Sequence, residues 1–67
     1  MRIDRAKFAA ALVRADLNGT RLAEKAGVSR GTVTAVRSGK SCSTETAEKL
    51  AAGLGVTVSD ITEEVRN

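Results

Sequence analysis

The amino-acid sequence predicts an all-α fold, and three observations support this. Helix-favouring residues, chiefly Ala, Leu, Val, Lys, Arg and Glu, dominate the 67-residue chain, which contains no Pro. Apolar residues recur at three- and four-residue steps in several stretches, which is the spacing of one helical face. Residues that can cap a helix precede these stretches, and glycines follow several of them. The length has room for one domain, which we expect over residues 1–67.

The first two helices are predicted over residues 4–15 and 19–26. One face of the first carries the apolar residues Phe8, Ala11, Leu12 and Ala15. Asp4 is positioned to cap its start, and Asn18 is positioned to cap the second helix. The intervening polar residues break the helical pattern, so they predict a turn.

A third helix is predicted over residues 30–38, although its β-branched residues favour a strand by propensity. These residues are Thr32, Val33, Thr34 and Val36. Strict alternation fails because Gly31 and Ala35 interrupt it. Ser29 and Gly39 supply caps at the two ends, which favours a helix.

A fourth helix is predicted between its cap at Ser43 and Gly55. Its inner face carries Ala47, Leu50, Ala51 and Leu54. Thr57, with Asp60 three residues later, is a variant capping box that predicts a short fifth helix. The residues expected to point inward from it are Val58, Ile61 and Val65. We expect residues 63–67 to fray.

The formal net charge of +3 conceals an uneven distribution along the chain. Residues 1–42 carry nine Lys or Arg against three Asp or Glu, a balance of +6. Residues 43–67 carry two against five, a balance of −3. A basic first part indicates a polyanionic partner, but an unevenly charged solvated surface gives the same pattern. Charge alone therefore does not assign a function.

Several classes of protein are disfavoured by composition. No apolar run approaches the roughly 20 residues that span a bilayer, and the N-terminus lacks the apolar core of a signal peptide, so we expect a cytoplasmic location. The chain has no His and a single cysteine, Cys42, which excludes an internal disulfide and an ordinary zinc ligand set. Cys42 is interpreted as a free thiol, with oxidative linkage of two copies as the alternative.

Catalysis is not predicted, because the chain lacks a His, a second Cys and a phosphate-cradling glycine loop. Glu63 and Glu64 are expected at an exposed helix end, not in a cleft. Ser29, Ser43 and Ser59 lack a nearby base and are interpreted as caps or neighbours of caps. No cofactor, metal or small-molecule effector is predicted.

The most informative stretch is Gly19–Ser38, GTRLAEKAGVSRGTVTAVRS. Two short helices joined by a glycine-containing turn cross steeply, so the positions that face the crossing have strict size limits. Ala23 is small where a large side chain would hold the helices apart, and Gly27 suits the turn. Apolar bulk comes from Leu22, Val28, Val33 and Val36. This combination favours a helix-turn-helix over a generic helical hairpin.

The segments LAEKAGVSRGTVTAVRSGK (22–40) and ETAEKLAAGLGVTVSDI (45–61) resemble the lambda-repressor-like, Cro-type helix-turn-helix family, also known as the xenobiotic-response-element family. The resemblance implies a compact five-helix fold, a helix-turn-helix at 19–38 and sequence-specific binding of duplex DNA. Two positions depart from the family pattern: Gly19 stands where Gln is common, and Arg37 replaces a common acidic residue. The loop between the first two helices also looks about one residue short.

In this family's docking geometry, the N-terminal half of the third helix enters the major groove. Residues that point away from Val33 and Val36 are then expected to contact bases: Ser29, Arg30, Gly31, Thr34 and Ala35. Phosphate contacts are expected from Asn18, Gly19, Thr20, Arg37, Ser38, Lys40 and Ser41. Arg30 has two interpretations, a bidentate contact to guanine or a phosphate contact. Arg14 and Arg21 are candidates for the backbone-facing edge, whereas Lys25 is interpreted as solvated surface.

The resemblance predicts a transcriptional regulator of repressor type, from a bacterium, a phage or a mobile element, that binds a pseudo-palindromic operator as a homodimer. Val58, Ile61 and Val65 are core candidates, with a dimer contact as their alternative role. Two further alternatives are an antitoxin-type protein-interaction module on the same fold and the DNA-binding part of a longer regulator.

Overall fold

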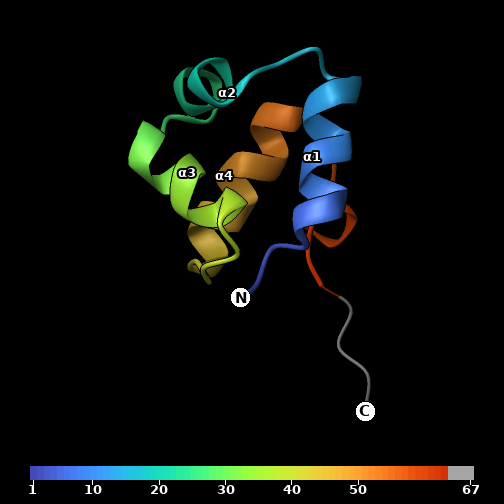
Figure 1. The fold of residues 1–67 in the computed structure, drawn as a ribbon, viewed down its shortest axis with the longest axis vertical. Helices are drawn as coiled ribbons and strands as arrows, with labels where there is room; N and C mark the ends of the chain where they lie inside the picture. Colours follow the sequence, from blue (N-terminus) through green and yellow to red (C-terminus); the bar gives the residue numbers. More distant parts are fainter. Residues whose placement is uncertain (64–67) are drawn as a thin grey trace.

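The computed structural model describes residues 1–63, and Figure 1 shows their arrangement. In order, the elements are α1 (Arg5–Arg14), α2 (Gly19–Ala26), α3 (Arg30–Arg37), α4 (Thr44–Leu54) and the 3₁₀ helix η1 (Val58–Asp60). The predicted all-α fold is confirmed. The prediction of a fifth α-helix is wrong, because the segment after Thr57 makes a single 3₁₀ turn. Val65 and the fraying predicted for the C-terminus lie outside the described residues, apart from Glu63.

Each α-helix begins at the cap that the sequence predicted. A side-chain oxygen of the cap accepts a hydrogen bond from the backbone N–H three residues later, at 2.8–3.1 Å, in Asp4, Asn18, Ser29 and Ser43. Gly27 and Gly55 end α2 and α4 in the left-handed conformation, with φ of 72° and 73°. The third helix ends at Arg37, one residue earlier than predicted, and Ser38 is its C-terminal cap.

The connection from α1 to α2 is short because Asp16 adopts a left-handed conformation, with φ of 56°. Asp is among the few non-glycine residues that tolerate this region. The N–H of Leu17 then donates to the carbonyl of Leu12 at 3.0 Å, which closes the turn. This geometry explains how a short loop leads from α1 into α2.

The core is formed by the predicted inner faces of the helices. The largest side chains with almost no exposure are Phe8, Ile3, Leu22, Leu50, Ile61, Val33 and Val36. Because Ile61 is fully buried and Val58 is half-buried against the core, the core assignment holds for both residues. α2 packs against both α3 and α4, which fixes the position of the helical pair that follows α1 (Figure 1).

Gly53 of α4 lies directly against α2. A Cβ atom at this position would lie 3.1 Å from Cβ of Ala26 and 3.1 Å from Cδ1 of Leu22. The absence of a side chain at Gly53 therefore allows α4 to pack directly on α2.

The segment before α1 is ordered, which the sequence did not predict. Ile3 forms an antiparallel bridge with Thr62, and the N–H of Asp4 donates to the carbonyl of Ile61 at 2.8 Å. The side chain of Ile3 is 1% exposed, so it belongs to the core. The two ends of the described chain therefore lie side by side.

The same N-terminal segment also contacts the loop between α3 and α4. The N–H of Cys42 donates to the carbonyl of Met1 at 2.8 Å. Cys42 itself is half-buried against the core. Within residues 1–63, no helix has the length and apolar character needed to cross a membrane.

Candidate nucleic-acid interface

The turn between α2 and α3 has the geometry that the sequence predicted. Gly27 supplies the left-handed residue, and the N–H of Val28 donates to the carbonyl of Ala23 at 3.0 Å. Leu22 and Ala23 are buried, with 0% and 3% exposure. Val33 and Val36 of α3 are also buried, and Val28 is half-buried against the core. The small residue at position 23 thus lies in the tight crossing that requires it.

The outer face of α3 carries the residues predicted to contact bases. Arg30, Gly31 and Thr34 are exposed on this face, whereas Ala35 is half-buried. Ser29 is exposed, but its hydroxyl accepts from the N–H of Thr32 at 3.1 Å and also pairs with the Thr32 hydroxyl at 2.9 Å. Arg30 and Thr34 are therefore the side chains with the greatest freedom to form new polar contacts.

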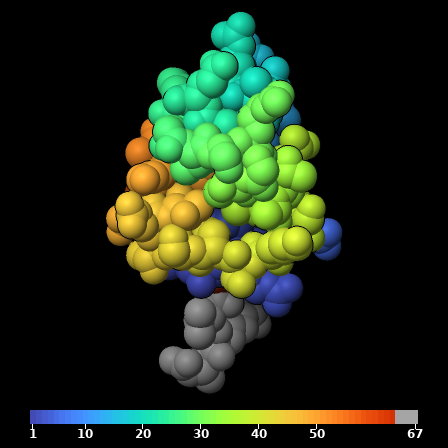
Figure 2. Space-filling view, turned by 90° about the vertical axis from the view of Figure 1, so that its left-hand side faces the viewer, coloured from blue at the N-terminus to red at the C-terminus, as the bar shows by residue number. Residues whose placement is uncertain are grey.

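A hollow lies between the first turn of α2 and the outer face of α3; we call it the α2–α3 hollow. It is lined by Gly19, Thr20, Arg30, Gly31, Val33, Thr34 and Arg37. The structure thus brings members of the predicted base-contacting and phosphate-contacting sets into one concave surface. Figure 2 looks onto this side of the molecule, where the green residues of α2 and α3 form the upper part of the surface.

The start of α2 presents donors to the same surface. Oδ1 of Asn18 accepts from the N–H of Arg21 at 2.8 Å, which leaves the Asn18 side-chain NH₂ group available. The N–H groups of Gly19 and Thr20 are in the first turn, where an α-helix offers them no internal partner. These groups are positioned to bind an anion.

The loop after α3 completes the surface and is held by backbone hydrogen bonds. The N–H of Lys40 donates to the carbonyl of Ala35 at 3.1 Å, and Gly39 has a φ of 93°. Lys40 and Ser41 are exposed. The Ser38 hydroxyl donates to the carbonyl of Thr34 at 2.9 Å, so its proton is already engaged within the helix.

With this geometry in view, the chain matches the model of the helix-turn-helix family HTH_3 over residues 9–61. The chain belongs to this family. The family comprises Cro/C1-type, lambda-repressor-like DNA-binding regulatory domains and is not an enzyme family. DNA is therefore the partner class of this helix-turn-helix domain.

Two solved structures share the fold of the helix-turn-helix domain. They are described as PhpD with cadmium complexed with hydroethylphosphonate and as native PhpD with cadmium atoms. Each has a TM-score of 0.82 and 22% sequence identity to this chain, which it matches over its full length. The match spans 15% of the PhpD chain, so this likeness concerns the fold alone. No curated protein sequence matches the chain.

The cations of the helix-turn-helix domain's outer surface are not neutralised by neighbouring acids. Within residues 1–63, the ion pairs are Arg2 with Glu63 at 3.9 Å and Lys49 with Glu45 at 3.4 Å. The exposed side chains of Arg30, Arg37 and Lys40 have no carboxylate of the described residues within 4 Å, and the same holds for Arg14 and Arg21. This surface therefore carries positive charge that a polyanion can neutralise.

Residues 1–63 contain no group of three His, Cys, Asp or Glu side chains placed to hold a metal ion. The carboxylate of Asp60 accepts from the N–H of Thr57 at 3.0 Å. Hydrogen bonds from the backbone and side chain of Thr57 lower the pKa of Asp60 below its usual value of 3.8. Asp60 is therefore a structural cap.

Proposed function

We propose that the chain is a sequence-specific, repressor-type transcriptional regulator of a bacterium, a phage or a mobile element, acting in the cytoplasm. It inserts α3 into the major groove of an operator. The observation that carries the proposal is the α2–α3 hollow, in which Arg30 and Thr34 lie across from the unpaired donors of the first turn of α2. A helix with exposed polar side chains beside an anion-binding helix start suits simultaneous contact with base edges and backbone.

Base recognition is assigned to the exposed face of α3 and its cap: Ser29, Arg30, Gly31, Thr34 and Ala35. Arg30 carries most of the discrimination, because a guanidinium can donate two hydrogen bonds to O6 and N7 of guanine. Thr34 offers a hydroxyl to several bases and a methyl group to thymine. Gly31 allows the helix to approach the groove floor closely, since the space beside it is open. A Cβ atom at Gly31 would meet a single side-chain atom within 4 Å, Oγ of Ser29 at 3.8 Å.

Phosphate binding is assigned to two groups that flank α3. The residues are Asn18, Gly19 and Thr20 at the start of α2, and Arg37, Ser38, Lys40 and Ser41 after the recognition face. The first group uses backbone N–H groups and the positive end of the helix dipole. The second group uses mainly the charges of Arg37 and Lys40. Such contacts position the domain without reading the sequence.

A homodimer on a pseudo-palindromic operator follows from the small size of the recognition face. One short helix contacts too few base pairs for a high specificity ratio, and two copies one helical turn apart double the contacted sequence. The dimer contact is not assigned to Ile61, since that side chain is fully buried in the monomer.

The experiment that tests the proposal is selection of binding sites from a random duplex pool, with the protein–DNA stoichiometry measured on the enriched site. We expect a short inverted repeat bound by two chains. If no sequence is enriched and only weak, salt-sensitive binding is found, the sequence-specific role is wrong. That result would favour the alternative, a protein-interaction module of the antitoxin type.

A further inference from the structure

We propose that the DNA-contacting surface extends beyond the helix-turn-helix onto the first turn of α1, where Arg5 binds a phosphate of the backbone next to the α3–α4 loop. This inference rests on the proposed function and adds a contact from a different part of the chain. Local sequence patterns do not predict this contact, because Arg5 is more than thirty residues from the loop that it touches.

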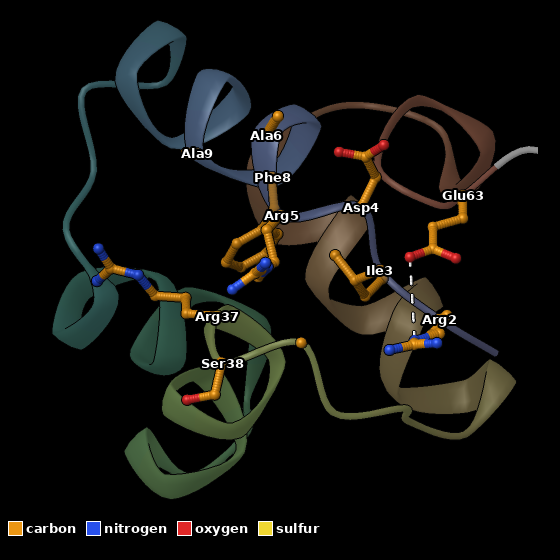
Figure 3. Close-up of a pocket in the computed structure, with 11 residues that line it drawn as sticks. Arg2, Ile3, Asp4, Arg5, Ala6, Phe8, Ala9, Arg37, Ser38 and Glu63 are labelled. Carbon is orange, nitrogen blue, oxygen red and sulfur yellow. Dashed lines mark ion pairs between the residues drawn. The ribbon is translucent and has the colours of Figure 1, made fainter.

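The geometry that supports the proposal is a second hollow, between the start of α1 and the end of α3; we call it the α1–α3 hollow (Figure 3). Its lining includes Arg2, Asp4, Arg5, Arg37, Ser38 and Gly39. The stem of Arg5 lies against the loop, since a Cβ atom at Gly39 would be 3.4 Å from Cδ and 3.6 Å from Nε of Arg5. Gly39 has no side chain, so the arginine can rest directly on the loop backbone.

The position of Arg5 relative to the loop is fixed by neighbouring contacts. Just before it, Ile3 is buried in the core, and the carbonyl of Met1 accepts from the N–H of Cys42 in the loop at 2.8 Å. Arg5 therefore moves with the loop that carries Lys40. Because the backbone that carries this cation is already positioned, its binding to a phosphate costs less conformational entropy than binding from a free chain end.

The positive charge of Arg5 is not neutralised by the described residues around it. It lies in the first turn of α1, which has no acidic residue and where the helix dipole disfavours a positive charge. Among residues 1–63, no carboxylate lies within 4 Å of its guanidinium. The acids of the hollow have other partners: Asp4 caps α1 by accepting from the N–H of Lys7 at 3.0 Å, and Glu63 pairs with Arg2 at 3.9 Å.

The α1–α3 hollow adjoins the proposed DNA-binding face. Arg37 lines both hollows, so they share an edge at the end of α3. Figure 3 shows the Arg37 guanidinium pointing away from Arg5, which places the two cations at different points along a backbone. In Figure 2, blue N-terminal residues border this face beside the yellow-green loop. Duplex DNA carries one phosphate charge per about 1.7 Å of axis, so successive phosphates are available to cations spaced along this edge.

The test compares Arg5→Gln with wild type by measuring the dissociation constant at several salt concentrations, on the selected operator and on an unrelated duplex. We expect the affinity of Arg5→Gln at low salt to fall by about threefold to tenfold on both duplexes. The slope of the logarithm of the association constant against the logarithm of the salt concentration should become shallower by about 0.9, which corresponds to the loss of one phosphate contact. Arg5→Lys keeps the charge and should recover most of the slope. Lys25→Gln, which removes an exposed cation of α2 outside both hollows, is the matched control.

Two outcomes overturn the inference. An unchanged salt slope for Arg5→Gln, alone or with a lowered melting temperature, would show that Arg5 only packs against Gly39. An equal loss of slope for Lys25→Gln would show a diffuse charge effect instead of a defined contact. Failure of the wild-type protein to bind duplex DNA would instead refute the proposed function itself, so the two failures are distinguishable.

Discussion

The guanidinium of Arg37 lies against Gly19, at the start of α2. A Cβ atom at Gly19 would be 3.4 Å from Nη1 of Arg37 and 3.5 Å from Cγ1 of Val33. The sequence departs from the common family pattern at both of these positions, and the structure shows that they are neighbours. The guanidinium of Arg37 thus supplies a donor beside the start of α2, at the position where family members commonly have Gln.

This contact predicts that Gly19→Ala lowers DNA affinity by less than about threefold, because the new methyl group would touch Nη1 of Arg37 at an ordinary van der Waals distance and shift the guanidinium only slightly. The fold should not be destabilised, since Ala is favoured over Gly in a helix by roughly 0.5–1 kcal/mol. Affinity is measured by titration with the selected operator, and stability by thermal unfolding. In an Arg37→Ala background, Gly19→Ala should have no further effect on affinity. An equal loss in both backgrounds would refute the coupling.

Substitutions at a base-contacting residue and at a phosphate-contacting residue are predicted to change DNA affinity in different ways. Arg30→Ala should lower affinity for the operator and relax the preference at one base pair, at a cost of about 1–3 kcal/mol. Lys40→Ala should weaken binding to all duplexes alike and make the salt slope shallower by about one. Titrations with operators altered at single positions separate the two effects. If Arg30→Ala weakens every duplex equally, Arg30 contacts only the backbone.

Two glycines are predicted to respond oppositely to the same substitution. Gly53→Ala should lower the free energy of unfolding by about 1–3 kcal/mol, because its Cβ would press on Leu22 and Ala26. Gly31→Ala, on the open face of α3, should raise the free energy of unfolding by roughly 0.5–1 kcal/mol. Denaturant unfolding of both variants makes the comparison. A stable Gly53→Ala variant would mean that α4 can move away from α2 at little cost.

Ile3→Ala is predicted to destabilise the domain by about 2–5 kcal/mol, the usual cost of removing a large buried aliphatic side chain. Ile3 is 1% exposed, so the change leaves a cavity between the chain ends. Val13→Ala is a suitable control because Val13 is 79% exposed, and it should have little effect. Urea unfolding measures both variants, and equal stabilities would show that the N-terminal segment contributes nothing to the core.

The cap at Asp60 predicts a defined pH dependence. Because hydrogen bonds from Thr57 lower the pKa of Asp60 in the folded state, its contribution to stability is complete above the usual value of 3.8. That contribution is lost as the pH falls below 3.8 and through the lowered pKa. Asp60→Ala should therefore be less stable than wild type at pH 7, and the difference should narrow below pH 3.8. A difference that stays constant on acidification would exclude the ionised cap.

Much of the fold was predictable because it depends on local sequence signals. Asp4, Asn18, Ser29 and Ser43 cap the helices they were predicted to cap, and glycine conformations end two of them. The apolar periodicity identified the inner faces correctly. The last element was mistaken because a capping box is compatible with both an α-helix and a single 3₁₀ turn.

The parts that the sequence did not predict depend on contacts between distant residues. Ile3 has no periodic neighbours before it, so nothing local indicated its pairing with Thr62. The apolar periodicity of α4 assigns no role to Gly53, and the approach of α2 explains why a glycine is suitable there. Within the candidate interface, the exposure of Arg30 and Thr34 follows from helical periodicity. The contact of Arg37 with Gly19 and the position of Arg5 depend on tertiary packing.

The pairing of the chain ends also bears on how the domain fluctuates. Its hydrogen bonds join residues at opposite ends of the sequence, so closing them costs more loop entropy than closing a helical turn. Such an edge is a natural site of local opening, detectable as faster amide hydrogen exchange at Asp4 than at buried positions of α4. Since the N–H of Cys42 is bound to the same segment, opening there would also release the loop that carries Lys40. Binding of DNA to that loop should therefore slow exchange at Asp4, because a ligand that prefers the closed form suppresses opening.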